Sequence, residues 1–147
     1  MSTGTDAVLG GRVELSPLTA ALAGVDLLLL VTFVVLGEFS HFGVTATAFA
    51  RAPGTAAPFL LGWVVLAPLA GVYAPAARGS VRGAVVRTAA AWTGTVAVAQ
   101  SLRATAPFPG DFAPAFVVVS LLVGLLLLLP WRVLVASRLA PAADAPA

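Results

Sequence analysis

Hydrophobic residues gather in four long runs along the chain, separated by short segments that are polar or rich in Pro. The runs cover about residues 18–38, 57–76, 83–103 and 114–136. The length of each run is close to that of a helix of about 20 residues, which is what is needed to cross a hydrocarbon core of roughly 30 Å. The pattern therefore predicts an all-α fold, a four-helix transmembrane bundle over residues 18–138. It leaves an N-terminal tail over 1–17 and a disordered, Ala- and Pro-rich C-terminal tail over 139–147.

Turn and capping residues suggest where the helices begin and bend. Thr55 is a candidate N-cap for the second helix, with Pro58 in its first turn, while Pro68 falls mid-span and predicts a kink. Residues 44–50 are semi-apolar and could lie along the membrane interface as a short helix. Asp111 follows a Pro- and Gly-rich turn and is predicted to cap the last helix.

The third run is the least apolar of the four, because Arg, Thr, Gln and Ser interrupt it. Its small residues Ala91, Thr95 and Ala99 recur every four positions and would lie on one helical face. Small residues allow helix backbones to approach closely in lipid. We therefore expect this helix to lie inside the bundle.

The distribution of Arg predicts the orientation. With four spans, one side of the membrane holds six Arg residues and the other holds only Arg51 and Arg103; the six are Arg12, Arg78, Arg82, Arg87, Arg132 and Arg138. Cytoplasmic segments carry the excess of positive charge, so both termini are predicted to be cytoplasmic. The same Arg residues could also bind anionic lipid head groups, although topology alone explains them.

Composition supports membrane residence and excludes several function classes. The 147 residues are 60% hydrophobic and 10% charged, with a mean hydropathy of +1.03 and a net charge of only +2. The Arg residues are dispersed among apolar spans, which argues against a nucleic-acid partner. The absence of Cys excludes disulfides and thiolate sites, and no nucleotide, metalloprotease or Ser-His-Asp motif is present. We expect no metal and no cofactor, and the lipid bilayer as the main partner.

Asp26 is the residue most out of keeping with its surroundings, since it lies within the apolar run from Leu18 to Gly37. A carboxylate near the centre of a membrane helix costs about 2.5–3.5 kcal/mol and usually faces a partner or a pathway. The predicted topology places Arg87 and Arg132 within reach of it. We hypothesise an intramembrane charge site of Asp26 with one of these two Arg residues. Its role is open between fixing the helix register and handling a proton or ion.

A second polar cluster, Glu38, Ser40 and His41, closes the first helix. Glu38 and His41 are three residues apart and would share a helical face. They could shuttle protons or contribute to a metal site if Asp111 and water completed it. Alternatively they form a solvated helix end, in which they cap the helix or pair with Arg51 or Arg103.

Several short patterns coincide along the chain: Asp26, Gly37 with Ser40-His41, Pro58-Phe59 with Gly62-Trp63, Trp92, Arg103, and Trp131-Arg132. In this order and spacing the chain resembles a family of small four-helix prokaryotic membrane proteins, from archaea and actinobacteria, that is catalogued as a domain of unknown function. The resemblance covers about residues 22–136. The chain departs from it at Glu38, where the family often has a basic residue, and at Pro130, where Gly is common. The resemblance implies the fold and membrane residence but no catalytic role.

These observations favour a non-enzymatic, multi-pass protein of the cell membrane, either a small transport or channel-like unit or an accessory subunit of a larger complex. A conducting pathway would need a homo-oligomer, because four helices enclose little volume. One alternative is a structural, partner-stabilising membrane protein. Another is a membrane enzyme acting on lipid or prenyl substrates with Asp26, Glu38 or His41 as acid or base, but these groups lie at two different membrane depths.

Overall fold

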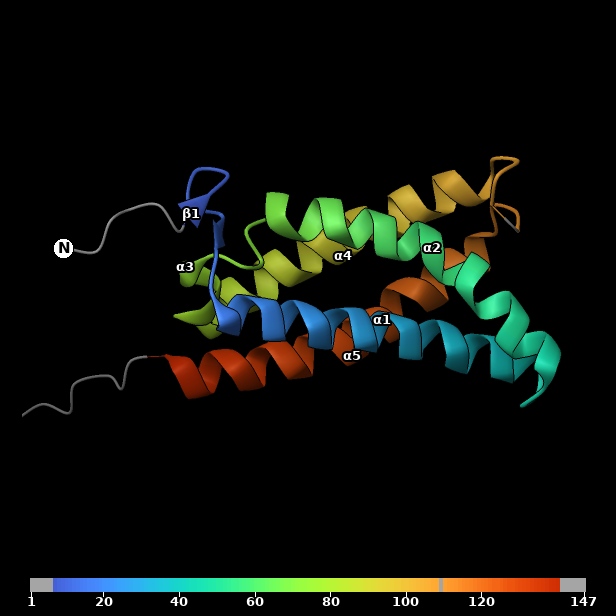
Figure 1. Ribbon diagram of the computed structural model, residues 1–147, viewed down its shortest axis with the longest axis horizontal. Helices are drawn as coiled ribbons and strands as arrows, with labels where there is room; N and C mark the ends of the chain where they lie inside the picture. Colours follow the sequence, from blue (N-terminus) through green and yellow to red (C-terminus); the bar gives the residue numbers. More distant parts are fainter. Residues whose placement is uncertain (1–6, 109, 141–147) are drawn as a thin grey trace, which may run out of the picture.

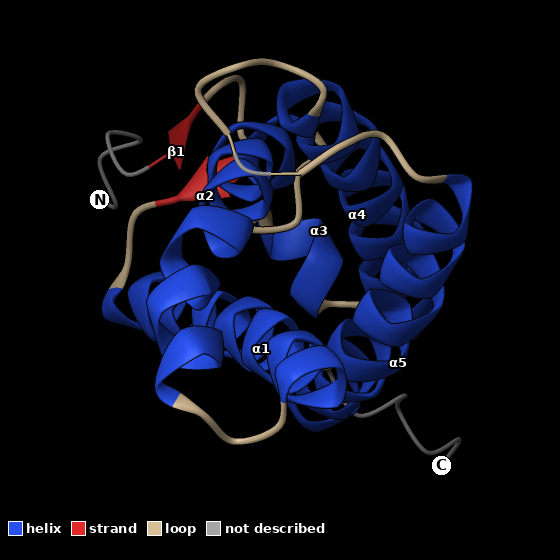
Figure 2. Cartoon of the chain, turned by 90° about the vertical axis from the view of Figure 1, so that its right-hand side faces the viewer, coloured by secondary structure: helices blue, strands red, loops and turns tan. Residues whose placement is uncertain are grey.

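The computed structural model describes residues 7–108 and 110–140, and within them the chain is almost entirely helical. Two short strands come first, and five helices follow them: β1 (Ala7–Val8), β2 (Val13–Glu14), α1 (Pro17–Phe42), α2 (Ala46–Leu69), α3 (Pro75–Arg78), α4 (Val81–Arg103) and α5 (Pro114–Leu139). The four long helices alternate in direction (Figure 1). Helix α1 packs beside α2 and α5, and α4 packs beside the same two helices, so α4 lies across from α1 (Figure 2).

Three of the long helices, α1, α2 and α5, are long and apolar enough to cross a membrane. Helices of 24 to 26 residues measure about 36–39 Å at 1.5 Å per residue, more than the roughly 30 Å of a hydrocarbon core. These helices indicate a membrane protein. Helix α4 is of similar length, at 23 residues, but it carries more polar side chains.

The helices begin where local hydrogen bonding favours it. The Ser16 hydroxyl accepts the N–H of Thr19 at the start of α1, and the Ser80 hydroxyl accepts the N–H of Gly83 at the start of α4. Helix α5 begins differently from the prediction, because Ala113 occupies the cap position and Asp111 does not cap it. Pro114 follows at the first helical position, where its missing N–H removes one group that would otherwise need a partner.

Helix α2 differs most from its predicted range of 57–76. It starts at Ala46, where the Thr45 hydroxyl accepts the N–H of Ala48 at 3.3 Å, and it ends at Leu69. The segment predicted to lie at the interface is therefore the start of α2. Pro53 and Pro58 lie in the helix interior and Pro68 is next to its end. The two halves of α2 are inclined to each other (Figure 1), as is common in helices that contain Pro. Ala-rich sequence before Pro58 sustains the helix, because Ala has the highest helix propensity.

The core lies between the four long helices, and its largest fully buried side chains are aromatic: Trp63, Trp92 and Phe59. Phe33 meets Phe59 edge to face at a centroid distance of 5.5 Å, and Phe59 stacks on Trp92 at 5.9 Å. The helices approach closely around these rings because small residues face them. A Cβ at Gly124 would overlap the Trp92 indole, and a Cβ at Gly62 would lie 3.2 Å from Thr95.

The predicted N-terminal tail is partly ordered, because β1 and β2 pair as an antiparallel hairpin. The Glu14 N–H donates to the carbonyl of Tyr73 at 3.3 Å, and Arg12 donates to the carbonyl of Leu69 at 2.9 Å. Arg78 forms an ion pair with the Glu14 carboxylate. The hairpin thus holds the connection between α2 and α3 in place. The predicted C-terminal tail lies outside the described residues from position 141 onward.

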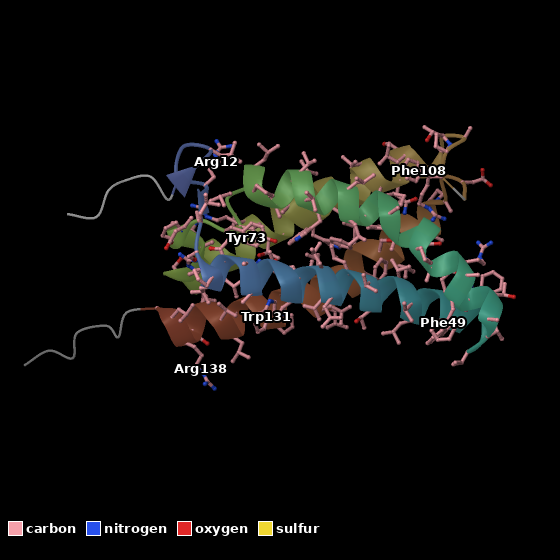
Figure 3. All side chains as sticks on the ribbon, in the orientation of Figure 1. Arg12, Phe49, Tyr73, Phe108, Trp131 and Arg138 are labelled. Atoms are coloured by element: carbon pink, nitrogen blue, oxygen red, sulfur yellow. The ribbon has the colours of Figure 1, made fainter. Side chains whose placement is uncertain are left out.

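We call the end of the molecule that holds this hairpin and the C-terminus of α5 the near end. The opposite end, which holds the connections from α1 to α2 and from α4 to α5, is the far end. Figure 3 shows Tyr73 and Arg138 toward the near end and Phe49 and Phe108 toward the far end.

Candidate functional site

Asp26 and Arg132 form an ion pair in the interior of the protein. Residues buried on α5 recur every four positions, and Arg132 is one of them: Ser120, Gly124, Leu128, Arg132 and Ala136. This periodicity turns the Arg132 guanidinium toward α1, where Asp26 lies on the buried face. Arg132 Nε donates to Asp26 Oδ1 at 3.1 Å, and Nη2 donates to Oδ2. Asp26 is 0% exposed and Arg132 3% exposed, so water does not reach the pair.

Two residues that sequence reasoning missed complete the network. The Tyr73 hydroxyl donates to Asp26 Oδ2 at 2.9 Å, and it accepts the indole N–H of Trp63 at 3.1 Å. Arg132 also donates from Nη1 to the carbonyl of Val72 at 3.4 Å, and its guanidinium lies 5.1 Å from the centre of the Tyr73 ring. The network therefore joins α1, α2, α5 and the connection after α2.

One sequence signal could have pointed to Tyr73. It is the only Tyr of the chain and stands in an otherwise apolar connection, and a buried carboxylate needs hydrogen-bond donors. Burial, followed by the neighbouring Asp26 carboxylate, raises the pKa of Tyr73 above its ordinary range. Tyr73 therefore keeps its proton and remains a donor to Asp26.

Arg87, the other predicted partner of Asp26, lies elsewhere. It is half-buried on α4 beside Gly71, and within the described part of the chain it forms no ion pair with Asp26. The reason is the helix order, since α4 lies across from α1 whereas α5 lies beside it. The choice between two Arg residues at similar depth is thus made by helix packing.

The three residues of the second predicted cluster differ in their burial and in their hydrogen bonds. Glu38 is buried between α1 and α2, where it accepts a hydrogen bond from the Thr55 hydroxyl at 2.6 Å and one from Arg51 Nε at 3.2 Å. Ser40 is exposed and donates to the carbonyl of Gly37 in its own helix at 2.7 Å. His41 is exposed beside Phe42 and does not contact Glu38 through a hydrogen bond. Among the described residues, no three His, Cys, Asp or Glu side chains are grouped so that they could hold a metal ion.

A cavity of about 460 Å³ opens at the far end between α1, α2 and α5. Its polar lining unites the second cluster with residues from α2 and α4: Glu38, Ser40, His41, Arg51, Thr55 and Arg103. The guanidinium of Arg103 lies 4.7 Å from the centre of the Phe116 ring. From the sequence, Arg103 is expected to contribute to topology, to the patterns of the family resemblance, or to pairing with the end of the first helix.

A second cavity, of about 370 Å³, lies between α1 and α5 at the near end and is lined almost wholly by apolar side chains. Trp131 and Arg138 stand at its α5 side. The contact between α1 and α5 is therefore flanked by a cavity toward each end, with the Asp26–Arg132 pair between them.

Comparison with known proteins identifies a family for this chain. The model of the family described as "Protein of unknown function (DUF3054)" matches residues 23–135, a range that includes Asp26, Arg132 and the polar residues of the far-end cavity. No curated protein and no solved structure shows significant similarity to the chain. The chain therefore belongs to the DUF3054 family, a family of unknown function.

Proposed function

We propose that this protein is a non-enzymatic, multi-pass protein of the cell membrane with four crossing helices and cytoplasmic termini, and that it serves as an accessory subunit. The observation that carries the proposal is the sealed Asp26–Arg132 pair. Both carboxylate oxygens accept hydrogen bonds, and the pair is buried on every side. A group of this kind fixes the positions of α1 and α5, and its three hydrogen bonds and its burial hold the carboxylate away from a travelling proton or ion.

Helix α4 can serve as the fourth span despite its polar residues. Thr93 and Ser101 face outward, and each hydroxyl donates at 2.8 Å to a carbonyl of α4 itself. Thr88, Thr95 and Gln100 face the interior. The lipid-facing surface of α4 therefore has few unsatisfied donors, which is the condition for residence in a hydrocarbon core.

The packing of the interior favours an accessory role over transport by a single chain. The rings of Phe33, Phe59 and Trp92 fill the space between the long helices. A conducting pathway would have to form between copies of the chain. An enzymatic role is also less favoured, because Asp26 and Glu38 are about 18 Å apart along α1 and each is engaged by an Arg.

Single-cysteine labelling tests the topology, since the chain has no Cys of its own. We expect an impermeant maleimide to label Thr105→Cys in intact cells. It should label Arg82→Cys and Ser137→Cys only after the membrane is permeabilised. Labelling of Arg82→Cys and Thr105→Cys from the same side would show that α4 does not cross. Labelling of Thr105→Cys and Ser137→Cys from the same side would show that α5 does not cross.

Proton flux into liposomes tests the role of Asp26. The protein is reconstituted with a trapped pH-sensitive dye, and a pH gradient is applied. We expect the flux to equal that of protein-free liposomes, both for the natural protein and for Asp26→Asn. A faster flux that Asp26→Asn abolishes would overturn the accessory role in favour of proton transport.

A further inference from the structure

The far-end cavity combines charged and apolar walls. The lining includes the charged side chains of Arg51 and Arg103 as well as Phe33 and Val34, which are both buried. Val119 of α5 also lines the cavity and is 49% exposed on the outer surface of the helices. A volume of about 460 Å³ lies within the range of about 300–1,000 Å³ that is typical of small-molecule sites. The cavity is thus amphipathic, and the exposed Val119 links it to the outer surface of α5.

Among the described residues, one cation of the lining has no ion-pair partner. Glu38 is occupied by Arg51 and Thr55. Arg103 forms no ion pair within the described part of the chain, and its Nε and Nη1 atoms are buried without a hydrogen-bond partner. The nearby Asp111 is exposed and does not bond to it.

Two buried guanidinium nitrogens without acceptors are costly, because their N–H groups have lost water and gained no hydrogen-bond partner. Contact with the face of the Phe116 ring compensates only part of this loss. An anionic ligand would supply the missing acceptors. The planar fork of an Arg side chain matches the oxygen atoms of a phosphate group in particular.

We propose that the far-end cavity binds a phosphate-bearing amphiphile, with its phosphate on Arg103 and Arg51 and its hydrocarbon chain along Phe33 and Val119. Such a ligand satisfies the charged wall and the apolar wall together, and its chain leaves the cavity at the exposed side of Val119. This inference rests on the proposed membrane residence of α1 and α5, but not on which side of the membrane the far end faces.

Titration of the full-length protein in a neutral detergent tests the inference, with three probes. Dihexanoyl phosphatidic acid carries both phosphate and chains, inorganic phosphate carries only the head group, and dihexanoylglycerol carries only the chains. We expect phosphatidic acid to bind at least about tenfold more tightly than either other probe, which corresponds to about 1.4 kcal/mol. Equal binding of inorganic phosphate would show a free-anion site, and equal binding of dihexanoylglycerol would show an apolar groove; either result overturns the proposal.

Variants locate the binding. Arg103→Gln should weaken phosphatidic acid binding at least about tenfold and should leave the protein folded, because it removes an unpaired charge. Val119→Trp fills the open side from an exposed position, so it should weaken phosphatidic acid binding and spare inorganic phosphate. Arg138→Gln, beside the near-end cavity, is the matched control and should bind as the natural protein does.

A folded Arg103→Gln protein that retains full affinity would overturn the proposal. An equal loss in Arg138→Gln would also do so, because it would show unspecific attraction to positive charge. These outcomes are distinct from failure of the accessory role, which is read from labelling and proton flux and does not depend on the far-end cavity.

Discussion

Replacement of Arg132 by Met would remove the cation of the buried pair and leave its carboxylate behind. Two hydrogen bonds to Asp26 and one to the Val72 carbonyl would be lost, and Asp26 would keep only the Tyr73 hydroxyl. Loss of one partner from a buried ion pair typically costs about 3–5 kcal/mol. We expect Arg132→Met to lower the free energy of unfolding by that amount. Asp26→Leu should cost about as much, because it strands the guanidinium instead.

The double variant Asp26→Leu, Arg132→Met removes both charges together. Apolar side chains of similar volume often replace a buried pair without loss of stability. The Tyr73 hydroxyl would lose its acceptor, however, which costs about 1–3 kcal/mol. The double variant should therefore be less damaging than either single variant, and the coupling energy between the two positions should be at least about 3 kcal/mol.

Reversible unfolding by sodium dodecyl sulfate in mixed micelles, followed by tryptophan fluorescence, would measure these free energies. Trp63 and Trp92 are buried in the core and would report its loss. Arg82→Met is the matched control, because Arg82 is exposed and forms no ion pair among the described residues, and it should cost about 0.5 kcal/mol or less. Single variants that cost under about 1 kcal/mol, or a double variant as costly as their sum, would refute a packing role for the pair.

Three further measurements test other contacts within the fold. Gly124→Ala should cost about 1–3 kcal/mol because its Cβ would overlap Trp92; Gly24→Ala, with open space around it, should be neutral or slightly stabilising, and equal effects would contradict the close approach of α4 and α5. Thr55→Val should cost about 1.5–3 kcal/mol through its bond to Glu38, against about 0.5 kcal/mol or less for the exposed Thr93→Val. Burial and Asp26 raise the pKa of Tyr73, so the folded state holds this proton more tightly than the unfolded state, whose pKa is near 10.0. The contribution of Tyr73 to stability should therefore be constant below about pH 10 and fall above it; tyrosinate absorbance appearing at the same pH in folded and unfolded protein would contradict this.

Local sequence was a good guide where one helix settles the matter by itself. The apolar runs that begin at Leu18 and Pro114 lie within α1 and α5. Helix α2 was harder, because Pro58 resembles a helix start and Pro68 an interior kink, while the Thr45 cap and the Ala-rich segment after it begin the helix earlier. Neither the Pro58 signal nor the Thr45 cap is strong by itself. Packing against α1 and α4 decides in favour of the earlier start.

The residues alone indicate that this chain has helices suited to a membrane and that Asp26 requires a partner. Both conclusions follow from local physics, since helix length, apolar composition and the cost of a charge in lipid are properties of a single segment. The identity of the partner, Arg132 rather than Arg87, and the part of Tyr73 and Trp63 in the network emerge only from the folded protein. Neighbours in the helix assembly are set by packing among all four long helices. A side chain's depth along its own helix is readable from the sequence, but the helix it faces is not.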